Sequence, residues 1–187
     1  KEEELIPSKT WGPQQEKEVR ETYDQARCER LVEKFARNQT RQVPTSWMFL
    51  QDRSRFRELL TTDPKSKYLP ADVRALWQQQ LPRLETSPQR EEQRQKDQRQ
   101  RLMIIAMMNK AGVPMMAGTD VGNPFLLPGF SLHDELAAFV RAGLTPGEAL
   151  KTATYNPAKF LGMLDLLGTV EKGKLADSAW TFPSIVS

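Results

Sequence analysis

The sequence predicts an α/β fold, because two short apolar segments alternate with stretches that have helical periodicity. Residues 43–50 and 113–117 have the length and the apolar or aromatic content that are typical of buried strands. Amphipathic helical patterns lie before, between and after them. This alternation is typical of βα units that build a parallel sheet.

The first part of the chain predicts one helix followed by the first strand. Residues 1–15 show no stable period and are expected to form an irregular lead-in. From residue 16 to 37, apolar side chains recur at mostly helical spacing with charged residues between them, which predicts one amphipathic helix. Residues 43–50 then predict a buried strand, with Pro44 at its start, where no ladder donor is needed.

Residues 51–101 predict a polar helical insertion rather than a second core. Within it, Gln89–Gln100 consists almost wholly of Gln, Arg, Lys, Glu and Asp. This composition has two interpretations, a solvated helix surface or a face that binds RNA or a protein partner. The same helix is expected to continue through Met108 into the core and to end at Gly112, a suitable C-cap.

After the strand at residues 113–117, two capping patterns predict two helices. Ser131 and Asp134 have the spacing of an approximate capping box at the start of the first helix. Thr145 and Glu148 have the same spacing at the start of the second, with a proline at its first turn.

Composition narrows the function classes. The chain has 27 Lys and Arg against 24 Asp and Glu in 187 residues, and the two signs are interleaved rather than gathered on one face, so we expect no nucleic-acid partner. We expect no membrane partner and a soluble chain without a signal peptide, since no run of eighteen apolar residues occurs; the compartment stays open. Because the sequence starts at Lys1 and ends soon after Asp177, with residues 178–187 as a short tail, we expect a fragment.

Asp120 is the leading catalytic candidate from the residues alone. It follows the predicted strand at residues 113–117 through Gly118 and Thr119. In α/β folds, an acid just beyond the carboxyl end of a buried strand lies where the chemistry takes place. The alternative is a turn-forming aspartate that hydrogen-bonds within its own loop.

Five successive motifs resemble the carboxyl-terminal part of the metal-dependent amidohydrolase family, in its imidazolonepropionase- and prolidase-like branch. They are Ala-Gly-Val-Pro-Met-Met-Ala-Gly-Thr-Asp (111–120), Pro-Gly-Phe-Ser-Leu-His-Asp-Glu-Leu (128–136), Ala-Gly-Leu-Thr-Pro-Gly-Glu-Ala-Leu (142–150), Thr-Tyr-Asn-Pro-Ala (154–158) and Gly-Thr-Val-Glu-Lys-Gly-Lys-Leu-Ala-Asp (168–177). The resemblance implies a partial (β/α)8 TIM barrel over residues 16–177, which contributes the last two strands and their helices.

The resemblance also implies a chemistry for Asp120, namely to bind or approach a divalent metal, expected to be zinc, and to accept a proton from the attacking water. The reaction would hydrolyse a C–N bond in a small amide, cyclic amide or dipeptide-like substrate. The family's other metal ligands are mostly histidines, and this sequence has only His133. One carboxylate cannot retain a catalytic zinc that takes three protein ligands. We therefore expect no stably bound metal and no activity in this chain alone.

Two further residues are candidates for substrate binding. His133 lies in the segment that opens the helix after Asp120, where it can contact substrate or make a structural hydrogen bond. Asn123 lies with Phe125 and Phe130 in the loop over the expected site, where these residues either shape specificity or pack the loop.

Two functions from different classes remain open. In the first, the chain is part of a metal-dependent hydrolase, and its partners are a small-molecule substrate and either a missing upstream half of the barrel or further copies of itself. In the second, it is a non-catalytic remnant or interaction module that associates through an exposed strand edge.

Overall fold

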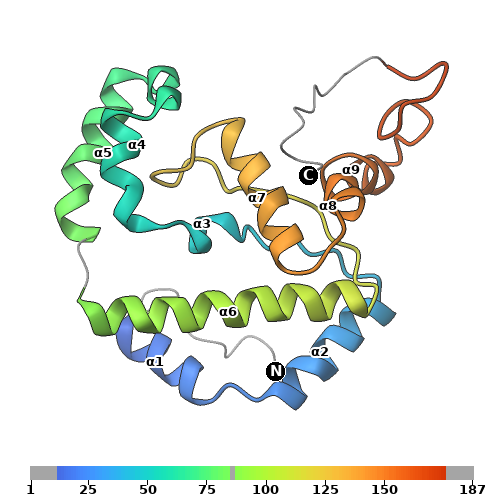
Figure 1. Cartoon of the computed structure of the whole chain (residues 1–187). Coiled ribbons are helices and arrows are strands. Elements are labelled where there is room, and N and C mark those ends of the chain that lie inside the picture. Colours follow the sequence, from blue (N-terminus) through green and yellow to red (C-terminus); the bar gives the residue numbers. More distant parts are fainter. Residues whose placement is uncertain (1–11, 85–86, 176–187) are drawn as a thin grey trace.

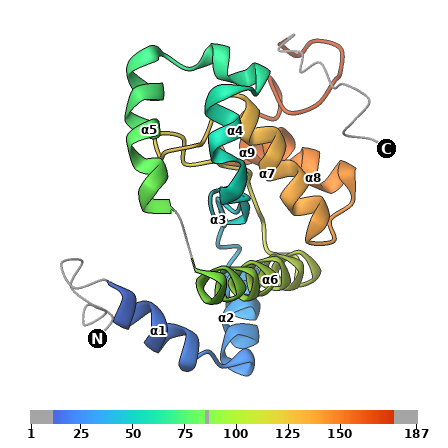
Figure 2. The same cartoon turned by 60° about the vertical axis from the view of Figure 1, so that its left-hand side comes forward.

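The structure, a computed structural model, describes residues 12–84 and 87–175 and is built from helices (Figure 1). In chain order the helices are α1 (Pro13–Glu21), α2 (Gln25–Arg37), α3 (Trp47–Leu50), the 3-10 helix η2 (Arg53–Arg55), α4 (Phe56–Thr61), the 3-10 helix η3 (Pro64–Tyr68), α5 (Ala71–Leu84), α6 (Pro88–Lys110), α7 (Phe130–Arg141), α8 (Pro146–Ala153) and α9 (Tyr155–Phe160). Helix α6 runs across the molecule, with α1 and α2 on one side and the other helices on the opposite side (Figures 1 and 2).

The predicted α/β fold is wrong, since the described residues contain no β-strand. Residues 113–117 are extended, but they pair with another segment only at a single parallel bridge at Gln42. Two hydrogen bonds form the bridge, from Gln42 N to Pro114 O (3.0 Å) and from Met116 N to Gln42 O (2.9 Å). Pro44 and Pro114 lack the N–H groups that a longer ladder would need. The two-stranded partial barrel is therefore corrected to a helical fold.

The other predicted strand, residues 43–50, ends instead in the four-residue helix α3. The carboxylate of Glu135, on α7, accepts hydrogen bonds from Ser46 N (2.8 Å) and Trp47 N (2.6 Å) at the start of α3. Glu135 is fully buried, and burial raises its pKa although the backbone N–H groups of Ser46 and Trp47 oppose this shift. A long-range contact thus stabilises a helix that local sequence does not predict.

Helix α6 supplies side chains to the other end of α3. Arg94 Nη1 donates to Gln51 O (2.6 Å), and Gln98 Nε2 donates to Phe49 O (2.9 Å). Both acceptors are carbonyls at a helix C-terminus, where intrahelical donors are missing. Part of the polar run at residues 89–100 therefore satisfies backbone carbonyls at the end of α3, and its other side chains are exposed or partly buried.

The helix predicted over residues 16–37 is divided into α1 and α2. Asp24 begins α2 as its N-cap, because its side chain accepts a hydrogen bond from Arg27 N (2.9 Å). Two other predictions are confirmed. Helix α6 ends just before Gly112, whose φ of 74° is in the left-handed region, and Thr145 and Glu148 form a complete capping box at the start of α8.

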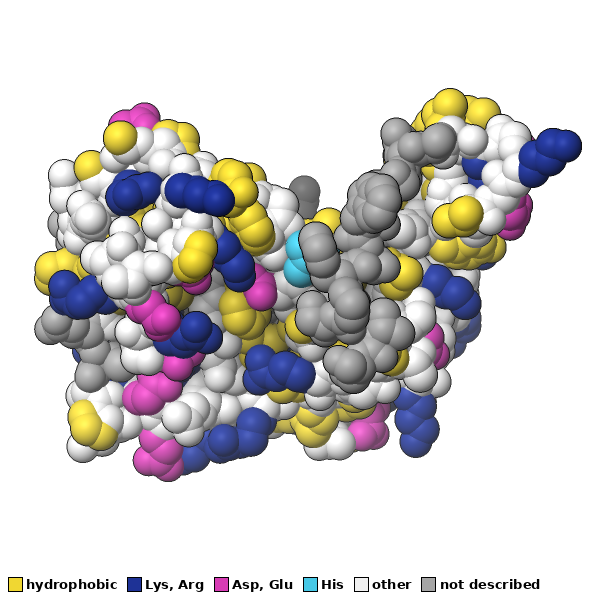
Figure 3. Space-filling model, turned by 45° about the horizontal axis from the view of Figure 1, so that its top comes forward, with side chains coloured by type: hydrophobic (Ala, Val, Ile, Leu, Met, Phe, Trp, Pro, Cys, Tyr) yellow, Lys and Arg dark blue, Asp and Glu magenta, His cyan; other side chains and the backbone are white. Residues whose placement is uncertain are grey.

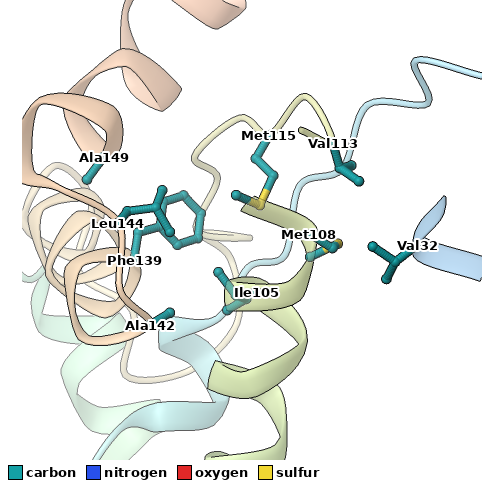
Figure 4. Close-up of a cluster of buried hydrophobic side chains, with 9 residues drawn as sticks. All are labelled: Val32, Ile105, Met108, Val113, Met115, Phe139, Ala142, Leu144 and Ala149. Carbon is teal, nitrogen blue, oxygen red and sulfur yellow. The ribbon is translucent and has the colours of Figure 1, made fainter. Parts of the chain in front are cut away.

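The larger buried cluster joins α2, α6, α7 and α8 around the extended segment (Figure 4). Its members are Val32, Ile105, Met108, Val113, Met115, Phe139, Ala142, Leu144 and Ala149. A second cluster packs α4, η3 and α5 against the loop before α7, and it consists of Phe56, Leu60, Leu69, Trp77, Phe125 and Leu127. The loop after Asp120 therefore connects the two cores.

Most of the predicted lead-in, and all of the tail at residues 178–187, lie outside the described residues. Among the helices of the two described ranges, none is long and apolar enough to span a membrane.

Candidate functional site

The loop that carries Asp120 follows an extended segment that is fixed by three separate parts of the chain. Besides the bridge to Gln42, Ala117 N donates to Thr152 O on α8 (2.9 Å). Asn156, on α9, donates from Nδ2 to the carbonyl of Met115 (2.7 Å). The Thr-Tyr-Asn-Pro-Ala motif thus helps to fix the backbone that leads to Asp120.

Gly118 lies where this segment passes very close to Val43. A Cβ atom built on Gly118 would lie 2.5 Å from Val43 Cγ1, which is closer than a van der Waals contact allows. Valine is restricted at χ1, so its methyl group cannot turn away without cost. Glycine at this position therefore permits the close approach that places the loop.

We expect Gly118→Ala to lower the free energy of unfolding by about 1–3 kcal/mol, the usual cost of overpacking. Urea denaturation measures this change. The double variant with Val43→Ala removes the opposing methyl groups and should recover most of the loss relative to Val43→Ala alone. Independent effects of the two substitutions would contradict the contact.

Asp120 is exposed, and its backbone has a φ of 56°, a left-handed conformation that aspartate tolerates better than most residues. Asn123 Nδ2 donates to Asp120 Oδ2 (2.8 Å) and to the Asp120 carbonyl (3.1 Å). The structure therefore brings together two of the predicted site residues. The same two hydrogen bonds are expected if Asp120 serves only to form the turn, which is the alternative role of this residue.

His133 is exposed on α7 (Figure 3, cyan). No hydrogen bond between described residues joins it to Asp120, whose side chain is bonded to Asn123. The capping box predicted from Ser131 and Asp134 is wrong, because α7 has Gly129 as its N-cap, at φ 78°, and no side-chain cap. Ser131 is instead buried, and Asp134 is partly buried beside the pocket described below.

The described residues do not fit a catalytic metal. Within residues 12–84 and 87–175, no three His, Cys, Asp or Glu side chains are grouped so that they could hold one. Asp120 offers a single carboxylate, and a catalytic zinc takes three protein ligands. The part of the chain that the structure describes therefore does not form a metal centre by itself.

The sequence analysis did not identify the buried carboxylate of Glu135 or the partly buried one of Asp134. A signal for Glu135 was present, because it shares the inward face of α7 with Leu136 and Phe139. An acid at an apolar position of a helix indicates a buried partner, since an unpaired buried charge is costly.

Comparison with known proteins finds similarity over part of the chain. A model described as the amidohydrolase family matches residues 73–181, which is more than half of the 187 residues. The imidazolonepropionase of Pseudomonas savastanoi pv. phaseolicola is 45% identical over 75 residues, or 39% of this chain and 18% of that protein.

Two further relatives show the same partial match. The imidazolonepropionase of Aeromonas hydrophila is 40% identical over 78 residues, 41% of this chain and 19% of that protein. That of Geobacillus kaustophilus is 43% identical over 68 residues, 36% of this chain and 16% of that protein. The match thus covers less than a fifth of the length of each of these curated relatives. No solved structure matches the chain.

Proposed function

Because this chain belongs to the amidohydrolase family, we propose that it contributes Asp120, as the proton-accepting carboxylate, to a hydrolase of C–N bonds. The substrate class is a small amide, cyclic amide or dipeptide-like compound. Imidazolonepropionate is the first compound to assay, since the similar proteins from three bacteria carry its name.

The observation that supports this role is the placement of Asp120. Its carboxylate is exposed at the end of a segment that Gln42, Thr152 and Asn156 hold in place. Asn123 donates to Oδ2 and orients the carboxylate, whereas Oδ1 receives no hydrogen bond from the described residues. A carboxylate held in this way accepts a proton from an attacking water and returns it to the departing nitrogen.

Amidohydrolases are generally metal-dependent, but Asp120 supplies only one carboxylate. A metal ion in such a hydrolase therefore needs further protein ligands from outside residues 12–84 and 87–175. Zinc and the role of Asp120 as a metal ligand stay predictions. We propose that the chain has no hydrolytic activity in isolation.

The experiment measures hydrolysis of imidazolonepropionate by this chain alone and by the natural gene product, together with the metal content of each. Asp120→Asn in the natural gene product should lower kcat about a hundredfold or more, the usual contribution of a general acid–base group. Asp165→Asn is the matched control, since Asp165 is an exposed loop aspartate. Unchanged turnover in Asp120→Asn, or loss of activity in both variants, would refute the proposed role.

The alternative is a chain that binds a partner without catalysis. Its support is the apolar surface of α9 and the segment after it, where Phe160 is 53%, Leu161 62% and Leu175 59% exposed. This alternative predicts concentration-dependent oligomers and a natural gene product that purifies without stoichiometric metal and hydrolyses no amide.

A further inference from the structure

A pocket of about 160 Å³ lies between the α3–α4 region and the start of α7. Its walls include the rings of Trp47, Phe56, Phe125 and Phe130. Figure 3 shows a hollow on this side of the molecule, with apolar side chains at its base and both acidic and basic side chains around it. A cavity of roughly this volume, about 150 Å³, holds one benzene ring in another protein. Asp120, Asn123 and His133 do not line the pocket.

The aromatic wall is preformed. Phe125 has a φ of 66°, an uncommon conformation for a bulky residue. Its ring stacks on Phe56 with centroids 4.2 Å apart and an interplanar angle of 1°, and Gln51 Nε2 donates to its carbonyl (3.1 Å). Strained residues persist only where surrounding contacts hold them, and they concentrate at binding sites.

Three of the four carboxylates in the lining already have partners. Asp52 accepts from Ser54 N (3.0 Å) and Ser54 Oγ (2.6 Å), and this side-chain hydrogen bond lowers the pKa of Asp52. Asp63 accepts from the backbone N–H of Lys65 (2.8 Å). Glu58 accepts from Arg55 Nε (3.4 Å).

Asp134 is the exception, because its carboxylate receives no hydrogen bond from any residue of the described ranges, although it lines the pocket. Burial raises its pKa, even though the charges of Lys65, His133 and Arg55 act in the opposite direction. Lys65 Nζ lies 5.6 Å from the centroid of the Phe130 ring, so one aromatic face of the pocket already attracts a cation. The carboxylates in the lining outnumber its two cationic side chains.

We infer that this pocket binds a small organic cation of about the size of one aromatic ring, with its charged N–H groups on the Asp134 carboxylate and its body against Phe56, Phe125 and Phe130. Amidinium and ammonium groups fit this arrangement. They bring donors to an acceptor that lacks them, and aromatic faces stabilise cations. The inference does not depend on the proposed hydrolase function, because none of its residues belongs to that site.

Titration of the chain with benzamidinium, benzamide and benzoate, followed by calorimetry at pH 7, tests the inference. These probes share one ring and differ in charge. We expect benzamidinium to bind at least tenfold more tightly than benzamide, and benzoate to bind more weakly still. Equal affinities, no binding, or preference for benzoate would overturn the inference.

Variants identify the group that discriminates between the probes. Asp134→Asn should abolish the preference for the cation while leaving the weak affinity for benzamide unchanged, and Phe130→Leu should weaken both. Asp165→Asn, on an exposed loop, is the matched control and should behave as wild type. Thermal unfolding of each variant verifies its fold. A preference for the cation that survives in Asp134→Asn would assign the charge recognition to another group and refute the role of Asp134.

The pH dependence gives a further readout. Protonation of Asp134 removes the negative charge, so benzamidinium affinity should fall as the pH drops through the raised pKa of Asp134. Asp52, Glu58, Asp63, Arg55, Lys65 and His133 also surround or line this pocket. Asp134→Asn retains all of them, so a loss of affinity that persists unchanged in this variant would contradict the inference.

Discussion

Glu135→Ala should lower the free energy of unfolding by about 3 kcal/mol. The side chain of Glu135 is 0% exposed, and its two oxygens accept the N–H groups of Ser46 and Trp47 at 2.8 and 2.6 Å. Alanine leaves both donors without their acceptor, and each unsatisfied buried group costs about 1–3 kcal/mol. Urea denaturation measures the loss, and amide exchange at Ser46 and Trp47 should become faster.

Glu33→Ala is the matched control, since Glu33 is exposed on α2, and it should change stability by less than about 0.5 kcal/mol. Equal losses in the two variants would show that the contact between α7 and α3 has no special importance. Glu135→Gln keeps one acceptor oxygen and should lose less stability than alanine.

The same residue makes stability depend on pH. Because burial raises the pKa of Glu135, the folded protein holds this proton at pH values where the unfolded chain has released it. Its contribution to stability is therefore largest below the ordinary glutamate pKa and decreases as the pH rises through the raised pKa. The stability of the wild type relative to Glu135→Gln should increase as the pH falls through this range.

Phe139→Ala should cost about 3–5 kcal/mol, the usual range for removing a large core side chain and leaving a cavity. Phe139 is 0% exposed and belongs to the cluster that joins α2, α6, α7 and α8 around the extended segment. The loss should appear as a lower urea midpoint with an unchanged slope.

Phe160→Ala provides the comparison for Phe139→Ala. Phe160 is 53% exposed and contacts the guanidinium of Arg41, 5.0 Å from its ring centroid. Truncation there removes a partly solvated cation–π contact, which contributes about 0.5–1 kcal/mol at exposed sites. A loss as large as that of Phe139→Ala would contradict the assignment of the core.

Local signals in the sequence predicted two helix ends correctly, although the capping box expected from Ser131 and Asp134 is absent. The capping box of Thr145 and Glu148 is present, and α6 ends before Gly112 as expected. In both cases the residues that determine the structure are within one helix turn of its end, so their spacing along the chain carries the information.

Long-range contacts account for what the sequence did not predict. The apolar run at residues 43–50 has the composition of a strand, but Glu135, Arg94 and Gln98 satisfy the free backbone groups of a short helix there. None of these partners is near that run in the chain. The same reason explains the aromatic pocket, where Phe56 and Phe125 come from separate segments and meet only in the folded protein.

The single bridge at Gln42 also has a consequence for the order of folding. Helices α7, α8 and α9 contact their neighbours in the chain. Gln42, in contrast, pairs with a segment from which it is separated in the sequence by all the helices from α3 to α6. Contacts between neighbours close short loops and lose little chain entropy. We therefore expect α7 to α9 to assemble early, with the segment before Asp120 held by Thr152 and Asn156, and the pairing at Gln42 to form late. The first part of the chain is thus joined to the Asp120 segment in one of the last steps.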